Sequence, residues 1–355
     1  MNFFFPASPP ETYPDWEEIS DCFRRLSWDD FRPRVTCEVQ EVSPNIFQIT
    51  VPQAFYADTN AYLVRGDKPT LIDPGHAYPE SVESLLAGMK SIGLALSDLA
   101  QVVLTHPHVD HAAACVPLRK IHPLPVAAYE GVGRKYAEYY HLMKVAYDHF
   151  RPRCPHLLAA GYRPEELEAF ARLYYLPPGP IGFQEALTEG SKIRMGNQDW
   201  EVFYAPGHSN EHILLLNPEG LGISGDLIVG RATSLGEIRV YLQTLEKLSR
   251  LPLKSLLPAH GSPISNPPKR IETARKTIAD LRNQALQLLE GPGLTLLDLT
   301  RAVMGDISKI HLASTSTGLS LSLLDELQSD GMVRPDPGTL AGDPSQVIYR
   351  KNVRI

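Results

Sequence analysis

The stretch THPHVDH at residues 105–111 decides how this chain is interpreted. Its first residue, Thr105, ends the run of residues 101–105 that predicts a buried strand. Its ligand-type side chains are His106, His108, Asp110 and His111. Imidazole and carboxylate groups are ligands that zinc favours in proteins. Because ionisable groups are costly to bury without a partner, the cluster predicts a metal site in the loop after a strand.

Three further ligand-type residues stand at the ends of later predicted strands. They are His208 in a Pro-Gly turn after residues 200–204, Asp226 after residues 222–224, and His260 after residues 255–258. Loops at strand ends carry functional side chains on a rigid scaffold. The ligand-type residues therefore extend the predicted site well beyond one segment.

The residues around the first cluster predict a layered α/β domain. Residues 41–51 contain strand-like alternation, and residues 61–64 and 70–73 flank a Gly-Asp turn that is typical of a hairpin. Residues 80–92 predict a helix before the strand at 101–105. Strand, helix and strand in this order favour packed α/β layers.

A helical segment at about residues 129–178 interrupts this pattern, with prolines that divide it into at least two helices. Its tyrosines are Tyr129, Tyr136, Tyr139, Tyr140, Tyr147, Tyr162, Tyr174 and Tyr175. We interpret the segment as an inserted cap that roofs the metal site and forms a largely apolar pocket. The alternative is that these tyrosines only pack the helices onto the core.

Both ends of the chain differ from the middle in the pattern of their sequence. Residues 1–36 predict an irregular arm with one short helix near residues 16–26. Beyond residue 267, the sequence predicts helices at 269–289, 295–303 and 319–329, and a ribbon of 331–334 with 346–350. Three helices and a ribbon resemble a winged-helix module. We therefore expect an arm at 1–36, a main domain at 37–266 and a small C-terminal domain at 267–355.

The bulk composition limits the classes of protein to consider. A net charge of −7 gives no overall attraction to nucleic acid. Four scattered cysteines without a CxxC pair favour reduced thiols over a disulfide framework. Prolines interrupt the apolar residues 3–5, and no apolar run approaches the ~20 residues that span a bilayer. We expect a cytoplasmic protein without a membrane partner.

These motifs together resemble the metallo-β-lactamase superfamily. The family pattern is HxHxDH, a later His after Pro-Gly, an Asp after Gly and a final His, and every part occurs here in order over about residues 40–265. The resemblance implies an α/β fold, an αββα sandwich with the metals at one edge of its two sheets. The inserted cap and the winged-helix-like tail would be additions to it.

The resemblance also implies two divalent metal ions, with zinc expected first and iron or manganese as alternatives. The first metal would be held by His106, His108 and His208, the second by Asp110, His111 and His260, and Asp226 would bridge both. A hydroxide shared by the metals would be the nucleophile, since two metals lower the pKa of water and polarise the attacked oxygen. Asp110 would also act in catalysis by orienting that water or shuttling its proton.

Two other residues near these motifs, Asp73 and His212, are not assigned as metal ligands. Asp73, in the sequence LIDPG, matches a further motif of the family. We interpret it as a partner that orients a ligand, with a turn-capping aspartate as the alternative. His212 follows His208 by four residues and matches no ligand position of the family, so we expect it to be structural.

The substrate is less constrained than the site. A tyrosine-rich roof suits a small acyl thioester, ester or lactone, as in the glyoxalase II-like branch, although no glutathione-binding pattern is found. The alternative is an endoribonuclease or other phosphodiesterase, suggested by the tail. From residue 269 onward the tail carries 11 Lys and Arg against 10 Asp and Glu. This near-neutral charge argues against a nucleic-acid partner and favours a packing element or a homodimer contact.

Two further classes fit the motifs less well. An iron persulfide dioxygenase of the same superfamily holds one iron with two histidines and one aspartate, whereas this sequence has the complete set for two metals. A non-enzymatic metal-binding regulator would not need an intact ligand set. We therefore expect binuclear hydrolysis.

Overall fold

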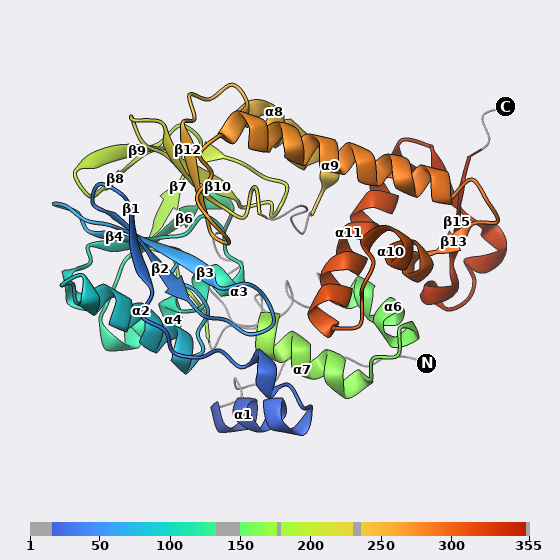
Figure 1. The fold of residues 1–355 in the computed structure, drawn as a ribbon, viewed down its shortest axis with the longest axis horizontal. Coiled ribbons are helices and arrows are strands. Elements are labelled where there is room, and N and C mark those ends of the chain that lie inside the picture. The colour runs from blue at the N-terminus through green and yellow to red at the C-terminus, as the bar shows by residue number, and fades with distance from the viewer. Residues whose placement is uncertain (1–15, 133–149, 176–178, 230–235, 353–355) are drawn as a thin grey trace.

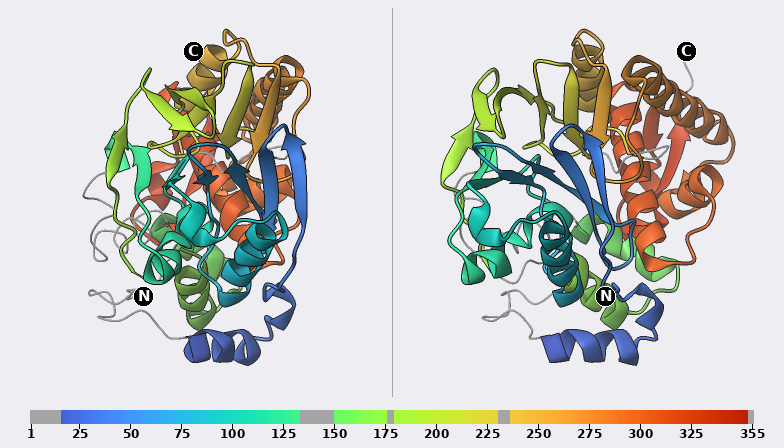
Figure 2. Two further views of the ribbon diagram at one scale, coloured as in Figure 1. Left: turned by 90° about the vertical axis from the view of Figure 1, so that its left-hand side faces the viewer. Right: turned by 60° about the vertical axis from the view of Figure 1, so that its left-hand side comes forward.

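The computed structural model describes residues 16–132, 150–175, 179–229 and 236–352. Its central part has four layers, in which two sheets face each other and helices cover both outer faces (Figure 1, Figure 2). This arrangement confirms the predicted α/β sandwich.

The first sheet has seven strands in sequence order and lies under the helices of the first half of the chain. The strands are β1 (Val39–Ser43), β2 (Ile46–Val51), β3 (Thr59–Val64), β4 (Thr70–Ile72), β5 (Gln101–Val103), β6 (Val126–Tyr129) and β7 (Glu185–Leu187). Pairing is antiparallel from β1 to β4 and parallel from β4 to β7. Its outer face packs against α2 (Pro79–Ser91) and α4 (Cys115–Ile121) through residues such as Leu63, Leu85 and Leu118.

The second sheet has five strands in the order β12-β11-β10-β9-β8. They are β8 (Lys192–Met195), β9 (Gln198–Tyr204), β10 (Ile213–Leu216), β11 (Leu221–Gly225) and β12 (Ser255–Pro258). Helices α8 (Ile238–Leu248) and α9 (Pro267–Leu288) cover its outer face. Between the two sheets, Trp200 is fully buried among aliphatic side chains from both, including Ile72 and Leu257.

The predicted strands and the first helix occur within a few residues of their expected bounds, with one difference of kind. Residues 41–51 form a hairpin rather than one strand, because the chain turns between β1 and β2 at Asn45, whose φ is 63°. Asparagine tolerates this left-handed conformation better than most residues. The short strands β6 and β7 were not predicted.

The N-terminal arm and the insertion pack together. The arm forms α1 (Trp16–Arg25), and the described part of the insertion forms α6 (Cys154–Ala159) and α7 (Pro164–Tyr175). Both contact one aromatic cluster around Phe55, here called the Phe55 cluster. Its buried members include Phe23, Trp28, Phe55, Tyr78, Phe150, Phe170 and Ile310. Tyr136, Tyr139, Tyr140 and Tyr147 lie outside the described residues.

The C-terminal part follows α9 with β13 (Leu294–Thr295), α10 (Leu296–Met304), α11 (Ile310–Ser329), β14 (Val333–Pro335) and β15 (Ile348–Lys351). Its strands form an antiparallel sheet in the order β13-β15-β14. The predicted helices and ribbon are present, although α11 begins at Ile310 rather than near residue 319. The winged-helix assignment itself stays a prediction.

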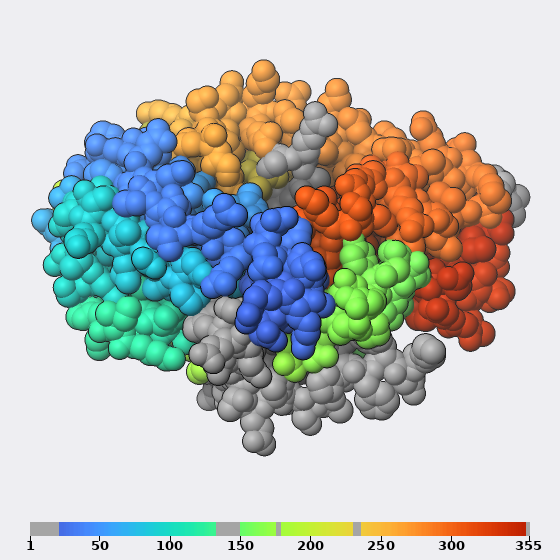
Figure 3. Space-filling view, turned by 60° about the horizontal axis from the view of Figure 1, so that its bottom comes forward, coloured from blue at the N-terminus to red at the C-terminus, as the bar shows by residue number. Residues whose placement is uncertain are grey.

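The apolar core crosses the expected boundary at residue 266. Leu214 of β10, Tyr241 of α8 and Leu323 of α11 belong to one buried cluster. On the lower face of the molecule, the arm, the insertion and α11 lie side by side (Figure 3). The domain division therefore stays a prediction, and the parts share their packing.

Short 3-10 turns complete the described structure at Asp29–Phe31, Leu96–Asp98, Glu130–Val132, Arg151–Arg153, Pro337–Thr339 and Pro344–Gln346. Among the described helices, none combines the length and the hydrophobicity that crossing a membrane requires.

Candidate metal centre

The seven predicted ligand residues converge at one edge of the two sheets. In the second sheet, β9 and β11 are both antiparallel to β10, and β12 is parallel to β11. The carboxyl ends of β9, β11 and β12 therefore lie at the same edge. His208, Asp226 and His260 follow these three ends, while the loop after β5 and the short helix α3 (Val109–Ala112) bring the THPHVDH residues to them.

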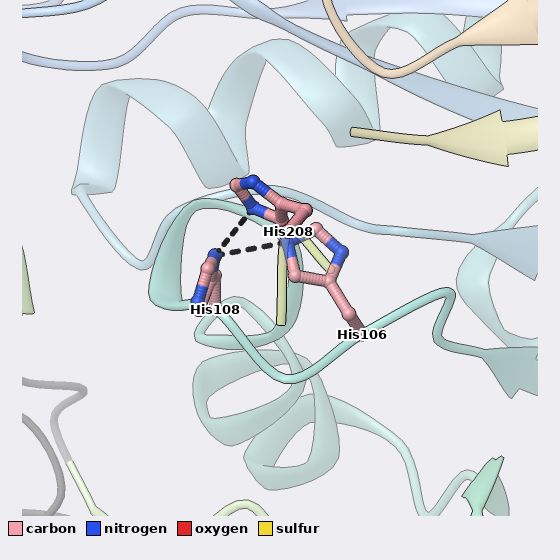
Figure 4. Close-up of side chains that lie close together, drawn as sticks. All are labelled: His106, His108 and His208. Carbon is pink, nitrogen blue, oxygen red and sulfur yellow. Dashed lines mark hydrogen bonds between the residues drawn. The ribbon is translucent and has the colours of Figure 1, made fainter. Parts of the chain in front are cut away.

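Three histidines form the first group (Figure 4). His108 Nδ1 lies 3.0 Å from His106 Nε2 and 2.9 Å from His208 Nε2. The three ring nitrogens thus point to one place, and they come from two loops about one hundred residues apart in the sequence. His106 Nδ1, on the far side of its ring, lies 3.1 Å from Thr105 Oγ1.

Asp110, His111 and His260 form the second group. Asp110 Oδ2 lies 3.6 Å from His111 Nε2 and 3.4 Å from His260 Nε2. The opposite ring nitrogens face acceptors. His111 Nδ1 donates to Asp73 Oδ2 at 3.0 Å, and His260 Nδ1 donates to the backbone oxygen of Asp58 at 2.9 Å. A proton fixed on Nδ1 leaves the lone pair of Nε2 directed into the group.

Asp226 lies between the two groups. Its Oδ2 is 3.5 Å from His208 Nε2, and its Oδ1 is 3.6 Å from His111 Nε2 and 3.5 Å from His260 Nε2. Each carboxylate oxygen therefore faces a different group of histidines.

Two buried atoms at this point lack hydrogen-bond partners within the described part of the chain. They are His111 Nε2 and Asp226 Oδ1. Buried polar atoms are nearly always satisfied, so each unsatisfied atom calls for an explanation. Separations of 3.4–3.6 Å are too long for good hydrogen bonds, and imidazole nitrogens and carboxylate oxygens facing a common point suit metal ions. The residues present thus fit a metal centre.

Asp73 contacts the Nδ1 side of the His111 ring, opposite the Nε2 that lies near Asp110 and Asp226. It is 1% exposed and accepts hydrogen bonds from the backbone N–H of Thr105 at 2.8 Å, from Thr105 Oγ1 at 2.6 Å and from His111 Nδ1. These contacts would let Asp73 orient His111, and that role stays a prediction. Thr105, which links Asp73 to His106, was not predicted to take part.

Gly225 lets the backbone turn so that Asp226 reaches the centre. Gly225, with φ 48°, ends β11 directly before Asp226. A Cβ at this position would lie 2.4 Å from Thr105 Oγ1 and 2.7 Å from His212 Nε2. The backbone must therefore pass close to the Thr105 side chain for Asp226 to reach the centre.

His212 supports the same turn. It is fully buried, its Nε2 accepts from the backbone N–H of Asp226 at 3.1 Å, and its ring stacks on His106 at 4.7 Å. The contacts agree with the expected structural role, and they show that this role is to hold the backbone of Asp226.

The histidine pKa shifts have opposite directions in the two groups. Burial and the neighbouring histidines lower the pKa of His108 to about 3 and lower the pKa of His106 well below its usual range. Burial also opposes the charged form of His260, but the carboxylates of Asp226 and Asp110 outweigh it and raise its pKa to about 9. His106 and His108 are therefore neutral, as imidazole ligands must be, whereas a cation bound beside Asp110 and Asp226 would displace the proton of His260.

Within the described part of the insertion, Tyr174 reaches the centre. Tyr174, on α7, donates from its hydroxyl to Asp110 Oδ2 at 3.3 Å. Its ring lies 4.4 Å from that of Tyr56, whose hydroxyl hydrogen-bonds the backbone oxygen of His311 on α11. This contact supports the predicted roof for Tyr174, whereas Tyr162 binds the backbone of Ile307 away from the centre.

Known proteins resemble this chain in sequence. The family model described as the Metallo-beta-lactamase superfamily matches residues 57–260, a range that contains all seven ligand-type residues. The Bacillus subtilis protein named "Probable metallo-hydrolase YqjP" is 29% identical over 262 residues, which are 67% of this chain and 79% of the relative. An "Atrochrysone carboxyl ACP thioesterase" of Emericella nidulans is 26% identical over 282 residues, 76% of this chain and 75% of that relative.

Solved structures resemble it in fold. A metallo-beta-lactamase family protein from Thermus thermophilus superposes with a TM-score of 0.71 at 20% identity, covering 88% of this chain and 100% of that one. A beta-lactamase domain protein from Burkholderia ambifaria gives the same TM-score of 0.71 and 20% identity, covering 90% and 95%. With the family match over more than half of its length, the chain belongs to the metallo-beta-lactamase superfamily.

Proposed function

We propose that this chain is a binuclear metal-dependent hydrolase that cleaves thioesters of small acyl groups. That it is a hydrolytic enzyme follows from its superfamily and from relatives named metallo-hydrolase and thioesterase. The position of Asp226, with one oxygen toward each histidine group, is the observation that carries the two-metal assignment.

In this assignment the first metal is held by His106, His108 and His208. The second would be held by Asp110, His111 and His260, and Asp226 would serve both. Zinc suits these nitrogen and oxygen donors. Two such ions would lower the pKa of a water between them and polarise the carbonyl oxygen of the substrate.

Neighbouring residues hold the proposed ligands in position. Asp73 and the Asp58 carbonyl fix the rings of His111 and His260, and His212 fixes the backbone of Asp226. In the reaction, the oxygen of water bonds to the acyl carbon, the carbon–sulfur bond breaks, and the thiol leaves with one proton. We assign the transfer of that proton to Asp110, whose Oδ2 also accepts a hydrogen bond from the Tyr174 hydroxyl.

A named relative favours a thioester over other esters and lactones. The fungal relative named as an acyl carrier protein thioesterase aligns over three quarters of both chains. Tyr174, whose hydroxyl reaches Asp110, lies against Tyr56, and the two rings provide aromatic surface for the acyl group of any of these substrates.

A substrate panel tests the proposal. The zinc-loaded enzyme is assayed with acyl thioesters, aryl esters, lactones, a cephalosporin, bis-(p-nitrophenyl) phosphate and single-stranded RNA. We expect the highest kcat/KM with a thioester. Turnover confined to the phosphodiester or RNA would reject the proposal in favour of the nuclease branch.

A further inference from the structure

A pocket of about 540 Å³ opens beside the metal centre, between the loop that follows β12 and the first turns of α9. His260, a ligand of the second metal in our assignment, lines one part of it, and Lys269 and Arg270 line another. Its volume is that of pockets that hold a small-molecule ligand. In Figure 1, α9 starts next to the second sheet and runs toward the C-terminal helices.

The lining of this pocket is mixed, with the two cationic side chains beside apolar ones such as Ile228 and Ile264. Among the described residues that line it, none is an aspartate or glutamate, and Ser262, Ser265 and Thr273 add hydroxyl groups. No acidic side chain within the described ranges forms an ion pair with Lys269. Two cationic side chains, with no carboxylate among the described lining residues, favour an anionic ligand.

The side chains, rather than the helix backbone, would hold this anion. The first two helical positions are Pro267 and Pro268, which have no N–H. The next two N–H groups are already used, because Lys269 donates to Asn266 Oδ1 at 3.1 Å and Arg270 donates to the Asn266 backbone oxygen at 3.1 Å. Arginine and lysine side chains both bind phosphate, and arginine can do so with two parallel hydrogen bonds.

We propose that this pocket binds the phosphate of a phosphopantetheine thioester, so that the thioester lies at the metal centre and the phosphate contacts Lys269 and Arg270. The inference rests on the proposed thioesterase function. A phosphopantetheine thioester carries its phosphate at the end of a pantetheine chain opposite the sulfur. A pocket shared by His260 and two cations can bind both ends of such a substrate. The same group occurs on coenzyme A and on acyl carrier protein.

The charge distribution favours this ligand over RNA. A strand of RNA presents successive phosphates and requires an extended basic surface. The chain has a net charge of −7, and its near-neutral tail carries no such excess. Two cations at one pocket suit a ligand with a single phosphate group near the thiol arm.

The test compares three thioesters of one acyl group, carried on coenzyme A, on acyl carrier protein and on N-acetylcysteamine, which has no phosphate. We expect Lys269→Gln/Arg270→Gln to raise KM for a phosphate-bearing thioester by about tenfold or more relative to the effect on the N-acetylcysteamine thioester, with kcat changed less than KM. An effect on one carrier alone identifies the source of the phosphate, and an effect on both supports the shared group.

A matched variant controls for the loss of charge. Lys276→Gln removes a cation from the same helix, on an exposed residue outside the pocket, and we expect it to leave all three KM values within about twofold. Equal KM changes for the three substrates in the double variant would overturn the phosphate site while leaving the thioesterase function intact. Lack of turnover of all three by the unchanged enzyme would instead reject the function, and loss only of RNA cleavage would assign the cations to RNA.

Discussion

Asp226 occupies the position in the centre on which both histidine groups depend. Its two carboxylate oxygens lie 3.5–3.6 Å from histidines of both groups. We expect Asp226→Ala to lower kcat/KM by more than about a hundredfold and to reduce the bound metal per chain, because both ions lose a ligand.

The measurement for this variant is elemental analysis alongside thioester turnover, with circular dichroism as the check that the fold survives. His122→Ala, at a partly exposed histidine after α4, is the matched control and should retain metal and activity. Full metal loading with unchanged turnover in Asp226→Ala would contradict the bridging role.

Tyr174 gives a second prediction for a single residue. Its hydroxyl donates to Asp110 but lies outside the proposed ligand set. We expect Tyr174→Phe to lower kcat by about tenfold while metal content stays the same, since a hydrogen bond to a charged group contributes roughly 1.5–3 kcal/mol. Tyr162→Phe, in the same insertion but bonded to Ile307, should have little effect on kcat. A loss of metal in Tyr174→Phe would show that the tyrosine supports binding rather than turnover.

The sequence indicated the seven ligand-type residues but, apart from Asp73, not the groups that hydrogen-bond to them. Ligand-type side chains at strand ends carry a recognisable spacing, and the structure brings all seven together. The backbone oxygen of Asp58 has no sequence signature, because any residue supplies a carbonyl. Tyr174 could not be distinguished from its seven neighbours in the insertion, since only tertiary packing directs one hydroxyl to Asp110.

At the scale of elements, the loop between β2 and β3 connects the centre to the Phe55 cluster. Asp58 near its end holds His260, and Phe55 packs on Trp28 and Phe170 with ring centroids at 5.3 and 5.1 Å. Phe55 adopts φ 71°, which a bulky side chain rarely does. The aromatic contacts must therefore offset this backbone strain.

Phe55→Ala removes those contacts and leaves the positive φ in place. We expect a loss of about 3–4 kcal/mol in the free energy of unfolding and weaker retention of metal, as the Asp58 carbonyl loses its fixed position. Phe55→Gly is the matched variant, because glycine accepts the backbone conformation. Urea unfolding should therefore show it to be no less stable than Phe55→Ala. If both variants unfold at the midpoint of the unchanged protein, the cluster does not stabilise this loop.

Element bounds were predictable where hydrophobic periodicity was strong. Helix α11 is the main departure, since it begins at Ile310 within a run rich in serine and threonine. Such residues have weak helix propensity. Here Ser314 and Thr317 are fully buried, and Arg153 of the insertion donates to Ser314 Oγ at 3.2 Å. Packing against the insertion, which the sequence does not reveal, stabilises this first half of the helix.

At the scale of the whole molecule, α11 brings a buried histidine to the junction with the arm. His311 contacts the rings of Phe31 and Tyr56, with centroids at 5.4 Å in both cases. Burial and the nearby Lys309 ammonium lower its pKa to about 4. Because the unfolded chain binds this proton already near pH 6.5, stability is complete above that pH and falls as the pH drops toward 4.

We therefore expect His311→Gln to reduce the difference in stability between pH 7 and pH 5, by up to roughly 2 kcal/mol. Urea unfolding of both proteins at the two pH values measures it. The other titrating groups are common to both proteins and cancel in the comparison. An equal or larger pH difference in the variant would show that His311 is not the group responsible.

The central claim is that two metal ions, held by the seven converging residues, carry thioester hydrolysis. The most direct measurement is a zinc titration of the metal-free chain, with bound zinc per chain and thioester turnover followed in the same samples. The account predicts that turnover reaches its maximum only as the second equivalent binds. Saturation at one equivalent, or two bound ions without thioester turnover, would contradict it.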